Sequence, residues 1–164
     1  AGRIEELLQE NKKWTDDDMK ALNLDVTSRM HADIAHQLAA ILTEINQPEF
    51  QELTAQLQNW NGQHETDLTA PSIYYNLLSQ TMRLAMADEI SHPAFESLAA
   101  TSLLKNSYEQ FIGNENSPWW DDTKTEGRET RAQIVEQAAK KTISLLSAIG
   151  GRNPADWKWG KVHT

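Results

Sequence analysis

Residues 25–45, DVTSRMHADIAHQLAAILTEI, decide the fold class of this chain. Apolar side chains recur there at intervals of three and four residues, at Val26, Met30, Ile34, Leu38, Ile41 and Ile45. That spacing places them on one face of an α-helix, which Pro48 then closes. The stretch therefore predicts a long helix with one buried face.

Similar apolar spacing recurs along most of the chain. Thr15 resembles the N-cap of a further helix, with Asp16–Asp18 in its first turn and Met19 turned inward. In the last helix, Leu145 and Leu146 are expected to face the core. We predict an all-α chain of about six helices, because the apolar period is helical throughout. Besides the helix that Thr15 begins, helical stretches cover residues 3–12, 25–45, 50–60, 71–90, 95–111 and 128–149.

The ending differs from the rest. Trp157-Lys158-Trp159-Gly160-Lys161-Val162-His163-Thr164 has a strand-like pattern, so we divide the chain into a helical lobe (1–156) and a strand-like tail (157–164). No second strand signal lies upstream, and a lone strand edge with bare indoles is unstable in water. We therefore expect the tail to pair with protein outside this chain, or with a second copy in a dimer, and to leave Trp157 and Trp159 uncovered here.

Composition excludes several classes of protein. The chain has 164 residues, enough for one domain, and a net charge of −9, which argues against nucleic acid or an anionic membrane surface as a partner. It has no cysteine, which removes disulfides, thiolate metal sites and a cysteine nucleophile. No run approaches the roughly 18 apolar residues of a membrane span.

Histidine and carboxylate spacings suggest a metal site only weakly. His31 and His36 are five residues apart and diverge by about 140° on a helix. Glu89-Ile90-Ser91-His92 matches one Glu-x-x-His element of di-iron bundles, but that architecture needs two. The nearest second copy begins at Asp33, whose carboxylate is shorter. Surface charge pairs explain these spacings better, so we predict no metal site.

The sequence offers no catalytic nucleophile. No Gly-x-Ser-x-Gly elbow is present, and Ala1 stands where an N-terminal nucleophile would need Ser, Thr or Cys. Six tryptophans are many for this length, and they either plug helix ends and loops or form a platform for a carbohydrate or aromatic ligand. They are Trp14, Trp60, Trp119, Trp120, Trp157 and Trp159.

Several motifs occur in an order that resembles the penicillin acylase (penicillin amidase) family. The opening Arg3–Leu8 and the stretches Asp16–Asp18 and Leu24-Asp25-Val26 resemble that family's β chain. The later motifs are Trp60-Asn61-Gly62, the Tyr74-Tyr75 helix, Ser117-Pro118-Trp119-Trp120-Asp121-Asp122, Glu129-Thr130, Gly150 and Trp157-Lys158-Trp159-Gly160 with His163. The resemblance therefore covers nearly the whole chain.

The resemblance implies chemistry that this chain does not contain. Members are N-terminal-nucleophile hydrolases with an αββα core, in which the first serine of the β chain attacks an amide with its own amine as base. The nucleophile, the oxyanion-hole asparagine and the calcium ligands correspond to positions upstream of Ala1. The chain would be a helical segment that is inactive alone and packs on the catalytic core and the α chain. The parent would be a bacterial periplasmic or secreted enzyme that hydrolyses β-lactam side chains, N-acyl homoserine lactones or similar amides.

The resemblance assigns no catalytic, substrate-binding or metal residue here. A family arginine corresponds to a position about one residue before Ala1, so Arg3 does not take over its role. Asn61 stands where relatives often have Asp, and it supports the same turn. The residues that we expect to be structural or to dock on the core are Trp119, Trp120, Trp157, Trp159 and His163. The alternative hypothesis is a stand-alone helical binding module with a tryptophan-rich ligand surface.

Overall fold

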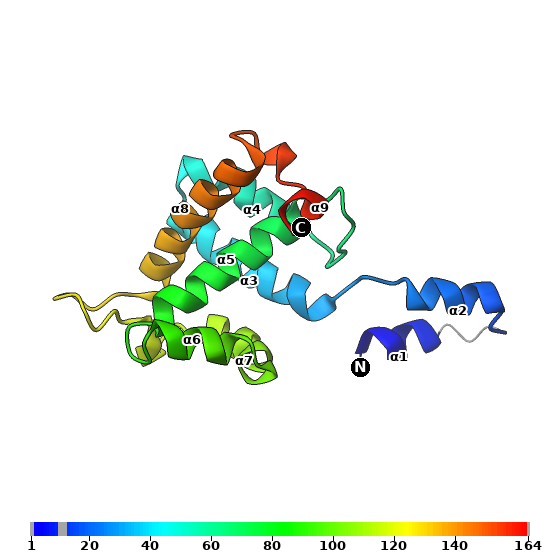
Figure 1. Ribbon diagram of the computed structural model, residues 1–164, viewed down its shortest axis with the longest axis horizontal. Helices are drawn as coiled ribbons and strands as arrows, with labels where there is room; N and C mark the ends of the chain where they lie inside the picture. Colours follow the sequence, from blue (N-terminus) through cyan, green and yellow to red (C-terminus); the bar gives the residue numbers. More distant parts are fainter. Residues whose placement is uncertain (1, 10–12, 164) are drawn as a thin grey trace.

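The computed structural model describes residues 2–9 and 13–163, and it confirms the all-α prediction. Within these residues the regular structure is helical (Figure 1). The α-helices are α1 (Gly2–Leu8), α2 (Asp16–Asn23), α3 (Arg29–Ile45), α4 (Gln51–Gln58), α5 (Ala70–Met86), α6 (His92–Ala99), α7 (Ser102–Gly113), α8 (Arg131–Gly150) and α9 (Trp159–Val162). Short 3₁₀ turns are η1 (Pro48–Phe50), η2 (Pro118–Trp120) and η3 (Pro154–Asp156).

Helix α5 is the centre of the body. It packs against α8 and α4, while α3 packs against α4, α7 and α8. In Figure 1, α5 crosses the middle of the body, with α4 and α8 above it and α6 and α7 below. Fully buried aliphatic side chains from these helices, such as Leu38, Leu77 and Val135, form one core. Burying each such side chain contributes about 1.5–3 kcal/mol, so this core is the main source of stability.

Helix α3 begins at Arg29, four residues later than the sequence predicts. Ser28 is its N-cap, and the Ser28 side chain accepts a hydrogen bond from the His31 amide. The preceding backbone pairs with a loop instead: Thr27 forms an isolated antiparallel bridge with Gln63. Because this pairing takes Val26 and the start of the helix away from the core, Val26 is 45% exposed.

The stretch 95–111 is two helices rather than one. It breaks between α6 and α7, where the Thr101 hydroxyl donates to the Leu98 carbonyl oxygen at 2.6 Å. Leu103 follows the break and is 73% exposed. The inward orientation predicted for Met19 and Leu145 is also wrong, because both side chains are exposed. Leu146 is fully buried, as expected.

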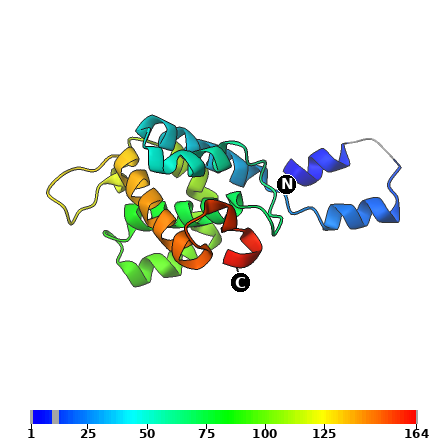
Figure 2. The same ribbon diagram turned by 90° about the horizontal axis from the view of Figure 1, so that it is seen from above.

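Helices α1 and α2 form an arm that extends from the body, as both views show (Figures 1 and 2). Several large apolar side chains of this arm face solvent. They are Ile4, Leu8, Met19 and Leu24.

The prediction of a strand-like tail at 157–164 is wrong. Pro154–Asp156 form a 3₁₀ turn and Trp159–Val162 a helical turn, while Thr164 lies outside the described residues. The tail packs against α5 and α8 of its own lobe. Trp157 is only 1% exposed, with no strand beside it, so the tail needs no sheet to cover this indole.

Candidate functional site

Trp157 fixes the end of the last long helix. Its indole Nε1 donates to the Gly151 carbonyl oxygen at 2.8 Å. A Cβ at Gly150 would lie 2.6 Å from the Trp157 ring, so only glycine leaves room for the indole there. Glycine is therefore required at position 150 because the Trp157 ring of the tail packs against it.

Trp159 and His163 form a stack of rings on α5. The backbone amides of Trp159 and Gly160 donate to the carbonyl oxygens of Leu68 and Thr66, each at 2.8 Å. The Trp159 ring stacks on Tyr75 at 5.1 Å and on His163 at 4.2 Å between centroids. His163 itself is exposed. These contacts give the tail a docking surface within its own chain.

The Trp119-Trp120 pair divides between the core and the surface. Trp120 is buried, its Nε1 donates to the Asn114 carbonyl oxygen at 2.7 Å, and its ring lies 4.2 Å from that of Phe111. Trp119 is 36% exposed. Of the residues predicted to be structural, Trp120 and Trp157 thus lie in the core of this lobe. A docking role of Trp119, Trp159 and His163 toward other protein stays a prediction.

A hydrogen-bonded chain of two histidines and a tyrosine lies beside this stack. His64 Nδ1 contacts the Val26 carbonyl oxygen at 2.9 Å, and His64 Nε2 contacts the Tyr75 hydroxyl at 3.0 Å. The same hydroxyl lies 3.1 Å from His31 Nδ1. Burial, with the nearby charge of His64, lowers the pKa of His31. Sequence reasoning missed this chain, since its members come from α3, α5 and a loop.

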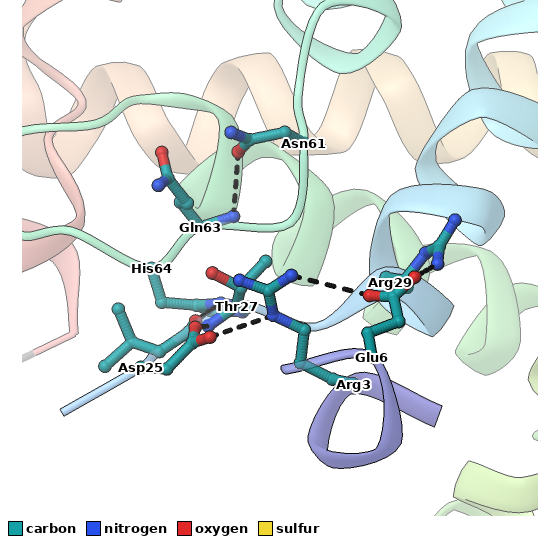
Figure 3. Close-up of polar contacts among 9 residues, drawn as sticks. Arg3, Glu6, Asp25, Thr27, Arg29, Asn61, Gln63 and His64 are labelled. Carbon is teal, nitrogen blue, oxygen red and sulfur yellow. Dashed lines mark hydrogen bonds and ion pairs between the residues drawn. The ribbon is translucent and has the colours of Figure 1, made fainter. Parts of the chain in front are cut away.

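The junction between the arm and the body is polar (Figure 3). Arg3 Nε donates to Asp25 Oδ2 at 2.8 Å, and Glu6 pairs with both Arg3 and Arg29. The hydrogen bonds from Thr27, together with the Arg3 guanidinium, lower the pKa of Asp25 although burial opposes this. Arg3 and Glu6 therefore join α1 to the segment before α3 and to the first residue of α3.

The Asn61-Gly62 turn contacts the segment that leads from the arm into α3. The Asn61 side chain accepts a hydrogen bond from the Gln63 amide at 3.1 Å (Figure 3), which is the turn geometry expected of Asn or Asp. Gly62 has a φ of +86°, and its carbonyl oxygen accepts from the Ser28 amide at 2.9 Å. Trp60 is buried behind the turn, and its Nε1 donates to the Gln63 carbonyl oxygen at 2.7 Å.

An acidic loop follows Trp120. The amide and hydroxyl of Thr123 donate to Asp88 Oδ2 at 2.8 and 2.9 Å, which ties the loop to the end of α5. Burial, with a hydrogen bond to Asp88 and the charge of that carboxylate, raises the pKa of Glu89 to about 7. Glu129 accepts a hydrogen bond from the Asp122 amide at 3.0 Å, so Glu129 closes the loop.

The described residues offer no metal centre. No group of three or more His, Asp or Glu side chains in ranges 2–9 and 13–163 is arranged to hold an ion. The histidines considered for a di-iron site make other contacts. His36 Nε2 lies 3.0 Å from the Trp60 carbonyl oxygen, and His92 Nε2 lies 3.2 Å from Arg83 Nη1. None of the helices described is long and apolar enough to cross a membrane.

Comparisons with known proteins identify relatives of the whole chain. The family model described as Penicillin amidase matches residues 1–164. Acyl-homoserine lactone acylase QuiP of Pseudomonas aeruginosa is 24% identical over 181 aligned positions, which cover 100% of this chain and 21% of the relative. QuiP of Pseudomonas syringae pv. syringae is 25% identical over 129 positions, 74% of this chain and 15% of the relative.

The matches show the family but cover a small part of each relative. The chain spans 21% or less of the length of these two curated relatives. No solved structure matches the chain. Because the family model covers every residue, the conclusion does not depend on a single motif. The chain belongs to the penicillin amidase family.

Proposed function

We propose that this chain is a helical lobe of an acyl-amide hydrolase, and that it acts by packing rather than by chemistry. The match of residues 1–164 to the penicillin amidase family carries the proposal. The sites described above support it, since their conspicuous side chains bind one another and the backbone. The lobe alone is inactive in this proposal, and its catalytic nucleophile, oxyanion hole and calcium ligands belong to other parts of the enzyme.

The substrate that we propose is an N-acyl homoserine lactone. The relatives named above are acyl-homoserine lactone acylases, and both align over most or all of this chain. The parent enzyme would hydrolyse the amide between the acyl group and the lactone amine, by acyl transfer to an N-terminal serine. Other acyl amides, such as β-lactam side chains, are the alternatives within the same reaction class. A periplasmic or secreted location accompanies this proposal.

The arm is the surface that we propose for contact with the rest of the enzyme. Its exposed apolar side chains include Ile4, Leu8 and Leu24. Covering them with other protein would remove apolar surface from water and stabilise the contact. The Arg3–Asp25 hydrogen bond and the Glu6–Arg29 ion pair join α1 to the segment before α3 and to the start of α3. The lobe would thereby support one wall of the active-site cleft.

The test uses the full-length protein that carries this segment. Purified enzyme and the isolated 164-residue chain are each incubated with N-acyl homoserine lactones and with a phenylacetyl amide, and the freed amine is measured. We expect release of homoserine lactone by the full-length protein only. If only the phenylacetyl amide is hydrolysed, the proposed substrate is wrong and a phenylacetyl amide replaces it. If no amide is hydrolysed, the proposed function is refuted.

The alternative, a binding module with a tryptophan-rich surface, has less support. Trp60, Trp120 and Trp157 are each 4% exposed or less, so they offer no ring face to a ligand. Each donates its Nε1 hydrogen to a backbone carbonyl oxygen of this chain. Saturable binding of a carbohydrate by the isolated chain, seen as a change in tryptophan fluorescence, would favour the binding module instead.

A further inference from the structure

A cavity of about 280 Å³ lies where the α6–α7 pair meets α3 and α5. Its apolar wall includes Leu78, Met82 and Phe95, which are all buried. This volume is near the lower end of the range for small-molecule sites, which are mostly apolar with a few placed polar groups. The cavity shares Met30 with the hollow at the base of the arm, and it shares Tyr75 with the ring stack of the tail.

The hydrogen-bond chain of His31, Tyr75 and His64 determines which atom His31 offers to a ligand. A carbonyl oxygen only accepts, so His64 Nδ1 must donate to Val26, and Nε2 of the neutral ring must accept from Tyr75. The tyrosine then has no second hydrogen, so its oxygen accepts from His31 Nδ1. Nε2 of neutral His31 is therefore a bare acceptor, and His31 is one of the residues that line the cavity.

Two further polar groups at the cavity lack partners. The Tyr74 hydroxyl is buried and makes no hydrogen bond within the part of the chain that the structure describes. Tyr74 is 0% exposed and lines the cavity. A buried hydroxyl without a partner destabilises the fold, and a ligand acceptor would satisfy it. Lys105 also lines the cavity, is exposed, and has no ion pair with any described residue.

We propose that this cavity binds a small organic acid with a flat apolar body. The body would lie against Leu78, Met82 and Phe95. The carboxylate would lie beside Lys105, as the cation, and would accept a hydrogen bond from the Tyr74 hydroxyl. His31 would take up a proton at Nε2 when the anion binds, and would then donate it to the carboxylate. The anionic class follows from the two donors at the cavity, since the buried Tyr74 hydroxyl has no acceptor and Lys105 carries a positive charge. This site lies outside the proposed amide chemistry and stands independently of it.

The experiment is a titration of the ¹⁵N-labelled 164-residue chain with benzoate, followed by NMR. Without ligand, we expect both His31 and His64 to show the Nδ1–H tautomer. Benzoate should shift the His31 ring nitrogens and the amides around Phe95 in a saturable way. A dispersed amide spectrum at each point shows that the chain remains folded.

Variants and a neutral analogue separate this site from general apolar binding. Lys105→Gln should weaken benzoate binding about two- to fivefold, the range expected for an exposed ion pair. The matched control Lys141→Gln, in α8, should leave binding unchanged, and benzyl alcohol should bind more weakly than benzoate. The proposal is overturned if no saturable shift occurs at His31 and Phe95, if the two lysine variants behave alike, or if benzyl alcohol binds as well as benzoate.

Discussion

At Gly62, both the backbone conformation and a close contact exclude a side chain. Its φ is +86°, and a Cβ there would lie 2.1 Å from the Ser28 carbonyl oxygen. Both the left-handed backbone and the contact exclude alanine without movement of the segment that leads into α3. We expect Gly62→Ala to lower the free energy of unfolding by about 1–3 kcal/mol, measured by urea titration. The control is Gly127→Ala, which meets no atom within 4 Å.

Glu89 gives the fold a defined pH dependence. Its pKa is raised from 4.5 to about 7 in the folded chain, so the folded state holds a proton that the unfolded state has released between these values. This stabilising contribution is complete below pH 4.5 and is lost as the pH rises through about 7. Glu89→Gln mimics the protonated form. We therefore expect its melting temperature relative to the parent chain to rise between pH 5 and pH 8, and an equal difference at both pH values would contradict this.

Sequence patterns identify single residues where the reason is local. Asn61 was expected to support its turn, and its side chain does accept from the Gln63 amide. The chain through His31, Tyr75 and His64 could not be predicted, because each member lies on a different segment and no fixed spacing joins them. Residues whose role comes from tertiary contact therefore remain invisible to periodicity.

At the scale of elements, the tail depends on one indole. Trp157 is buried against Gly150 and donates to the Gly151 carbonyl oxygen. We expect Trp157→Ala to lower the free energy of unfolding by about 3–5 kcal/mol, because it opens a cavity in the core. Trp119→Ala removes an equally large ring that is 36% exposed and should cost far less. Equal losses in the two variants, measured by thermal unfolding, would show that burial is not the cause.

The presence of the long helices was predictable from the sequence, but the residues at which they begin and end were not. The apolar period located the bodies of α3, α5 and α8 correctly, since long amphipathic helices carry many repeats. The start of α3 moved from Asp25 to Arg29 because the intervening backbone bonds to residues 62 and 63. The prediction of a strand-like tail was wrong for a related reason. Alternating tryptophans suggested a strand, yet Trp157 and Trp159 cover different parts of the same lobe.

At the scale of the molecule, ion pairs set the position of the arm. Glu6 pairs with Arg3 and Arg29, while Glu5 on the same helix has no ion pair with a described residue. We expect Glu6→Gln to speed amide hydrogen exchange in α1 and α2 by about two- to fivefold, since an exposed pair contributes about 0.2–1 kcal/mol. Glu5→Gln removes the same charge without a pair and should leave the exchange rate unchanged. The same acceleration in both variants would exclude the ion pairs as the cause.

The face-to-face contact of Trp159 and His163, at 4.2 Å and 9°, also has an optical consequence. An imidazole in van der Waals contact with an indole quenches its emission. The buried Trp60 also has an imidazole neighbour, His64, but that ring lies edge-on at 5.2 Å and 67° and does not belong to the last turn. Detachment of the last turn would brighten one emitter while the remaining fluorescence stays constant. The chain thus contains its own label for the state of its C-terminal turn.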